Sequence, residues 1–201
     1  MTVFKEIEKH VIDDAVELVA TLGVATPLIR PLAYEVDEER QKVARFLRAT
    51  LSRHVILVAT RLHAPKGTGP TGETASINSY LYYAEAEDAL TSAQADEFRS
   101  KRKAVVAKLE REGIPFADLL TFRHSELAHS LHRTLPFENQ LNSLPIWDFS
   151  YDTYELVLAI ERGASGTSTL ERKFHEWQDR GNTFWSVTED NSDYTLPQDG
   201  I

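Results

Sequence analysis

The chain of 201 residues contains no cysteine, which excludes a disulfide framework, a cysteine-based zinc ribbon and a thiolate nucleophile. It also lacks long hydrophobic runs: the longest apolar stretch, at residues 55–59, is far too short to span a bilayer. The charged N-terminus, MTVFKEIEKH, does not have the pattern of a signal peptide. We therefore expect a soluble cytoplasmic protein without a membrane partner.

Positive charge is scarce, since 22 lysines and arginines face 31 acidic residues and leave a net charge of −9. Proteins that coat nucleic acids need a broad positive surface, so we expect no DNA binding. An enzyme that grips a single phosphate locally is still compatible with this charge. The basic run at residues 99–111 is interpreted as a solvated helix face.

Alternating strand patterns are also absent, whereas helical periodicity covers most of the chain. Apolar residues at steps of three and four from Phe4 to Leu22 predict a helix that ends at Gly23. A longer helix is predicted for residues 37–62, with a buried stripe that begins at Val43 and includes Phe46. The sequence thus indicates an all-α protein built as an irregular bundle of about six or seven helices.

The remaining elements are expected from local signals. The glycines from Gly67 to Gly72 have GxGxxG spacing, but a helix precedes them where a nucleotide-binding loop would need a strand, so they are interpreted as a connector. Residues 1–188 are expected to form one domain, and residues 189–201 a flexible acidic tail. Three further helices are predicted before residue 137: one at 74–84, one that is capped by Thr91 and Gln94 and ends at Gly113, and one that starts at Pro115 and ends near Pro136. An irregular segment is predicted at 137–149. Two helices follow: one at 151–162 that is closed by Gly163, and one that begins with the capping box Ser168–Glu171 and ends or bends at Gly181.

The stretch FRHSELAHSLHR, residues 122–133, gathers three histidines and two arginines on one predicted helix. At ~100° per residue, Leu120, Leu127 and Leu131 share one side of this helix, and His129 lies roughly 200° from Leu127. His129 should therefore face away from the core that these leucines join.

Three chemistries compete for this cluster. A metal site could use Glu126 with His129, or His129 with His132, but a di-iron bundle needs a second Glu-x-x-His and the chain has none. Ser125 lacks the strand–elbow–helix context of a hydrolase nucleophile. An imidazole that titrates near pH ~6.5 and a permanently charged guanidinium can instead cleave RNA, whose 2′-hydroxyl is the nucleophile. This third chemistry needs no cofactor.

The segment from Arg123 to His129 resembles the R-x4-6-H motif of HEPN-domain proteins, and the all-helical chain is most similar to their AbiU2-type branch. The resemblance implies a metal-independent endoribonuclease of the toxin or phage-defence type. It also implies a homodimer, in which the two motif helices meet, and a possible cognate antitoxin. Arg123 would hold the scissile phosphate and His129 would act as acid and base. The supporting residues would be His124, Ser125, Glu126 and His132.

Arg48 and His54 form a second match to the same spacing. Ala49 follows this arginine, and His54 continues the apolar stripe, so His54 is interpreted as a buried structural histidine. Two other functions stay open. The chain could be a non-catalytic HEPN-like module that binds a nucleotide, RNA or a partner protein, or an unrelated helical protein whose histidines face water.

Overall fold

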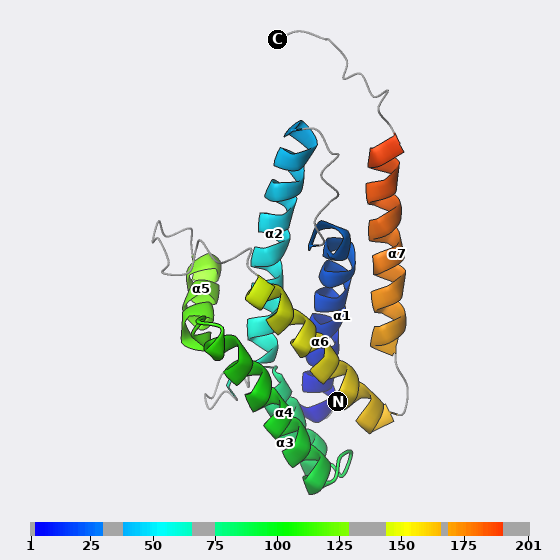
Figure 1. Cartoon of the computed structure of the whole chain (residues 1–201). Coiled ribbons are helices and arrows are strands. Elements are labelled where there is room, and N and C mark those ends of the chain that lie inside the picture. Colours follow the sequence, from blue (N-terminus) through cyan, green and yellow to red (C-terminus); the bar gives the residue numbers. More distant parts are fainter. Residues whose placement is uncertain (1–2, 30–37, 66–74, 129–143, 166–168, 191–201) are drawn as a thin grey trace.

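In the computed structural model of the chain, every regular element of the described residues is an α helix, which confirms the expected all-α class (Figure 1). The structure describes residues 3–29, 38–65, 75–128, 144–165 and 169–190. Within these ranges the helices are α1 (Val3–Ile29), α2 (Glu38–Leu62), α3 (Ile77–Ala86), α4 (Ser92–Arg111), α5 (Phe116–Ala128), α6 (Leu144–Ser165) and α7 (Thr169–Asp190).

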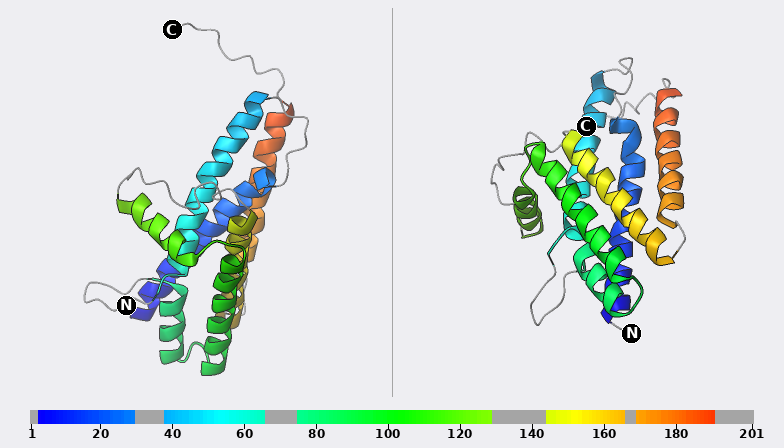
Figure 2. Two further views of the ribbon diagram at one scale, coloured as in Figure 1. Left: turned by 60° about the vertical axis from the view of Figure 1, so that its left-hand side comes forward. Right: turned by 60° about the horizontal axis from the view of Figure 1, so that its bottom comes forward.

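Helix α1 forms the centre of the bundle and contacts α2, α3, α6 and α7 (Figures 1 and 2). The apolar stripe predicted from Phe4 to Leu22 is buried, and Leu18 and Leu22 are completely enclosed. Burial of such a stripe is the main force that holds an amphipathic helix in place. None of the helices in the described part of the chain has the length and apolar character needed to cross a membrane.

The prediction that Gly23 ends the first helix is wrong, because α1 continues to Ile29. Gly23 instead lies where α1 crosses α7, and a Cβ atom there would be 2.8 Å from the Cβ of Trp177. The matching glycine on α7 is Gly181, where an added Cβ would lie 3.0 Å from the Cα of Val24. Gly181 therefore does not end α7, which continues to Asp190. The two glycines let the helix backbones approach closely.

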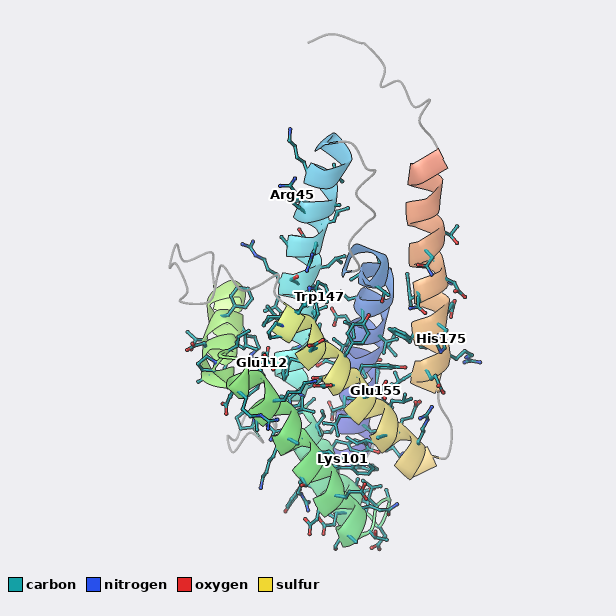
Figure 3. The ribbon with its side chains drawn as sticks, viewed as in Figure 1. Arg45, Lys101, Glu112, Trp147, Glu155 and His175 are labelled. Atoms are coloured by element: carbon teal, nitrogen blue, oxygen red, sulfur yellow. The ribbon has the colours of Figure 1, made fainter. Side chains whose placement is uncertain are left out.

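The predicted stripe on α2 is only partly correct. Val55, Val58 and Leu62 are fully buried, but Val43 and Phe46 are 54% and 69% exposed. The first half of α2 extends past the ends of α1 and α6, so no neighbouring helix covers it in the described structure (Figures 1 and 2). The label of Arg45 in Figure 3 marks this outer part of α2.

Local signals predicted the ends of α4, whereas α3 runs from Ile77 to Ala86 and not over the predicted residues 74–84. Ser76 caps α3 by accepting a hydrogen bond from the backbone N–H of Ser79. Thr91 and Gln94 form the predicted capping box of α4. The chain leaves α4 through Gly113, whose φ of 86° is a conformation that favours glycine.

The segment predicted as irregular up to residue 149 belongs to α6 from Leu144 onward. Pro145 lies in the first turn of this helix, where a missing backbone N–H costs nothing. Trp147 and Phe149 are buried, and Trp147 lies near the start of α6, which packs against α2 (Figure 3). Gly163 does not close α6, because the helix continues to Ser165.

Helix α7 begins with a cap that comes from another helix. The carboxylate of Glu161, on α6, accepts hydrogen bonds from the backbone N–H groups of Thr169 and Leu170 at 3.2 and 3.1 Å. Glu171 binds Arg162 of α6 at 2.6 Å. The predicted cap residue Ser168 lies outside the described residues.

Several other predictions fall on parts of the chain that the structure does not describe. They include the connector from Gly67 to Gly72, the helix end near Pro136 and residues 191–201 of the predicted tail. The first two residues assigned to that tail, Glu189 and Asp190, belong to α7.

Candidate functional site

Helix α5 carries the arginine of the predicted motif. Its first turn follows Pro115, whose carbonyl accepts a hydrogen bond from the N–H of Asp118 at 3.0 Å. Leu119 and Phe122 are buried in the core and hold α5 against its neighbours α2 and α4. Arg123 directly follows Phe122, so its side chain leaves the helix at the edge of the core and is half-buried.

The guanidinium of Arg123 is directed at α2. Its Nη1 donates to the backbone carbonyl of Thr60 across 3.4 Å, and its Nε is sealed from solvent without a hydrogen-bond partner. No carboxylate of the described residues lies within ion-pair distance of it. Burial lowers the pKa of Arg123, and the neighbouring Arg61 lowers it further. An arginine stays protonated in spite of such shifts, so Arg123 is a positive charge without a counter-ion among the described residues.

The neighbouring arginine is in the opposite situation, because two carboxylates of α1 neutralise it. Nη2 of Arg61 lies 2.9 Å from Oδ1 of Asp14 and 2.5 Å from Oε2 of Glu17. Burial raises the pKa of Asp14, and Arg61 only partly offsets this effect. An added anion would therefore be attracted to Arg123 more than to Arg61.

His54 was predicted to be a buried structural histidine, and this prediction is wrong. Its side chain is 42% exposed, and Nε2 lies 3.0 Å from Oε1 of Glu17. The carboxylate of Glu17, on the facing helix α1, pairs with the imidazole, which stays at the surface. Glu17 thus joins His54 to Arg61 on α2, seven residues further along the same face of the helix.

The buried histidine of the described core is His63, for which no sequence pattern predicts a special role. Its ring is fully enclosed and contacts the rings of Phe116 and Phe149. Nε2 lies 3.0 Å from Oγ1 of Thr153, and that hydroxyl already donates to the carbonyl of Phe149. Nε2 must therefore be the protonated nitrogen, and Nδ1 has no partner.

Burial lowers the pKa of His63 to about 3, and the positive charge of Arg102 contributes to this shift. A histidine held neutral in this way cannot act as an acid near neutral pH. Arg102 itself is half-buried and donates to the backbone carbonyl of His63. Lys108, also on α4, binds Asp152 of α6 at 2.7 Å. The basic run of α4 is therefore only partly the solvated face that was predicted.

The other motif residues are described less completely. His124, Ser125 and Glu126 lie in the last turns of α5, where the structure describes the backbone alone. His129 and His132 lie outside the described residues, so their roles stay predictions. The structure thus brings Arg123 together with Thr60 and the Arg61 network, and it does not place Arg123 relative to His129.

A metal centre finds no support in this part of the molecule. Among the residues that the structure describes, no three His, Asp or Glu side chains are grouped so that they could hold a metal ion. The side chains of Glu126, His129 and His132, considered above for a metal site, are not among those that the structure describes. Comparisons of the chain with protein-family models, with curated proteins and with solved structures find no match.

Proposed function

We propose that this protein is a metal-independent endoribonuclease of the toxin or phage-defence type. In this proposal Arg123 holds the scissile phosphate and His129 transfers protons. The active form is a homodimer, in which both copies of each residue line one cleft. A cognate antitoxin would be the natural partner of such an enzyme.

The observation that carries the proposal is that no carboxylate of the described residues pairs with Arg123. Its Nη2 forms no hydrogen bond to the described residues, while its Nη1 is held by the carbonyl of Thr60. A guanidinium held through one nitrogen can still donate through the other to the nonbridging oxygens of a phosphate. The neighbouring Arg61 is already engaged by two carboxylates, so Arg123 is the better phosphate ligand.

The reaction needs only groups that this motif provides. One imidazole accepts the proton of the 2′-hydroxyl, and the 2′-oxygen attacks phosphorus. The bond from phosphorus to the 5′-oxygen breaks, and a protonated imidazole returns a proton to that leaving oxygen. The products are a 2′,3′-cyclic phosphate and a free 5′-hydroxyl. Two histidines share the work of base and acid, and a dimer supplies two copies of His129.

The test is cleavage of a fluorescent RNA by the purified chain with EDTA present, followed by analysis of the new ends. We expect 2′,3′-cyclic phosphate ends in the wild type. The rate should fall by about 10²–10⁴-fold in His129→Ala, and by about 10²–10³-fold in Arg123→Ala. Arg123→Lys should recover part of this loss, since a lysine keeps the charge but not the fork.

Arg111→Ala is the matched control, because Arg111 is exposed on α4 and should not affect the rate. Cleavage that His129→Ala does not reduce would overturn the proposal. RNA binding without turnover, weakened by Arg123→Ala alone, would instead identify a non-catalytic HEPN-like module.

A further inference from the structure

A small pocket opens between four helices, separate from the arginine site. Its volume is about 220 Å³, and α1, α3, α6 and α7 each contribute to its wall. One apolar side chain from each helix illustrates its character: Val11, Ile77, Val157 and Leu170. An apolar cavity of roughly 150 Å³ is already large enough to bind benzene. This pocket can therefore hold a short hydrocarbon chain together with a polar head.

Three polar residues interrupt the apolar lining, namely Glu8, Tyr80 and Glu161. Tyr80 is only 5% exposed, yet its hydroxyl forms no hydrogen bond to any of the described residues. A tyrosine hydroxyl can both donate and accept, so Tyr80 offers an occupant of the pocket a hydrogen-bonding group. Burial, together with the negative charge of Glu8, raises the pKa of Tyr80 to about 12, so the hydroxyl stays neutral.

The charges at the pocket are negative. No lysine, arginine or histidine belongs to its lining. Glu8 binds the exposed Lys5 through Oε2 at 2.7 Å, and its Oε1 forms no hydrogen bond to the described residues. Glu161 is held in place because it caps α7, as described above. A hydrogen-bond donor that carries a positive charge therefore complements this pocket, and an anion would be repelled.

We propose that this pocket binds a small aliphatic primary amine in its protonated form. The ammonium group would donate to the Oε1 atom of Glu8 and to the hydroxyl of Tyr80, and the alkyl chain would lie against the apolar wall. This inference is independent of the proposed nuclease activity. The net charge of −9 also favours the approach of a cation to this protein.

Isothermal titration calorimetry of the full chain with three six-carbon probes tests the proposal. Hexylamine hydrochloride, 1-hexanol and sodium hexanoate share the hydrocarbon chain and differ in the charge of the head group. We expect hexylammonium to bind with a Kd on the order of 0.1–1 mM, the range open to a ligand of this size. Hexanol should bind at least about 10-fold more weakly, because a neutral head group gains no charge-assisted hydrogen bond. Hexanoate should bind weakest of the three.

Two variants separate the roles of charge and shape. Glu8→Gln should weaken hexylammonium binding by about 10-fold and leave hexanol binding unchanged. Tyr80→Phe should weaken it by a smaller factor, because only one neutral hydrogen bond is lost. Glu6→Gln is the matched control, since Glu6 is an exposed carboxylate on the same helix and removes the same charge from the chain.

Amide chemical shifts locate the binding. They should change for residues of α1, α3 and α6 around the pocket and not for α5. The proposal is overturned if hexanol binds as tightly as hexylammonium, if Glu6→Gln and Glu8→Gln act alike, or if no binding is detected.

Discussion

At the scale of single residues, three polar side chains show how the surroundings decide what a residue can do. Arg123 is positive and lacks a carboxylate partner in the described structure, whereas Arg61 is held by two carboxylates. His63 is sealed between aromatic rings. The same residue type thus takes a structural or a potentially chemical role according to what the neighbouring helices present to it.

The enclosed His63 should make the stability of the protein depend on pH. Its pKa is about 3 in the folded protein, against an ordinary value of 6.5 in the unfolded chain. Between these values the unfolded state binds more protons, so the free energy of unfolding rises with pH. The contribution of His63 to the free energy of unfolding is complete above the pKa of the unfolded chain. It is lost as the pH falls toward the pKa of the folded protein. The slope can reach ~1.4 kcal/mol per pH unit from this group alone.

Urea unfolding followed by circular dichroism between pH 4 and 6 measures this effect. His63→Phe should give a shallower slope than the wild type, because a phenyl ring cannot bind a proton. His175→Gln should keep the wild-type slope, since His175 is exposed on α7. Equal slopes in the wild type and His63→Phe would contradict the assignment of a neutral buried imidazole.

The sequence could not distinguish these histidines, because helical periodicity describes one helix at a time. His54 lies on the same side of α2 as Leu51 and Val58, which predicts burial. Its exposure depends on Glu17 of α1, a residue 37 positions away in the chain. His63 directly follows Leu62 and is buried because α5 and α6 supply aromatic rings around it. Contacts of this kind are set by tertiary packing.

At the scale of helices, the local signals at the two ends of α4 predict the structure correctly, and signals that depend on a second helix do not. The capping box of Thr91 and Gln94 and the stop at Gly113 are local, and both are present. The sequence predicts helix ends at Gly23 and Gly163 and an end or a bend at Gly181, but all three lie inside helices. At each of these glycines, atoms of another helix lie so close that a Cβ atom would contact them, and the sequence of one helix does not reveal such a contact.

The crossing of α1 and α7 should be sensitive to one methyl group. Gly23→Ala would place a Cβ 2.9 Å from the backbone nitrogen of Gln178, and a backbone atom cannot move aside cheaply. We expect a loss of about 1–3 kcal/mol in the free energy of unfolding, in spite of the gain of up to ~1 kcal/mol that alanine normally brings to a helix. Urea unfolding at pH 7 measures the difference.

Gly163→Ala is the matched comparison within α6. Its new Cβ would lie 3.0 Å from the Cζ atom of Phe98, at the far end of a side chain that can shift. The gain in helix propensity and the cost of the contact with Phe98 should nearly cancel, so that the free energy of unfolding changes by less than about 1 kcal/mol. If Gly23→Ala were as stable as Gly163→Ala, the close approach of α1 and α7 would not be the reason for Gly23.

At the scale of the whole molecule, the all-α class followed from periodicity, but the arrangement of two copies cannot be read from one chain. The proposed nuclease needs the α5 helices of two protomers to meet, because a single protomer supplies one copy of His129. The absence of cysteine allows a direct test, since a single introduced cysteine can carry a spin label without competing sites. Pulsed electron paramagnetic resonance then measures the distance between the labels of two protomers.

Thr121→Cys and Arg172→Cys provide the two label positions. Thr121 is exposed on α5, two residues before Arg123, and Arg172 is exposed on α7, on the opposite side of the bundle (Figure 1). If the motif helices meet, the distance between Thr121 labels should be clearly shorter than that between Arg172 labels. Sedimentation of each labelled protein checks that the dimer is retained, and dilution with unlabelled chain should remove the signal. A monomer, or a dimer with the shorter distance at Arg172, would be incompatible with a shared cleft, because two catalytic histidines could not then reach one phosphodiester.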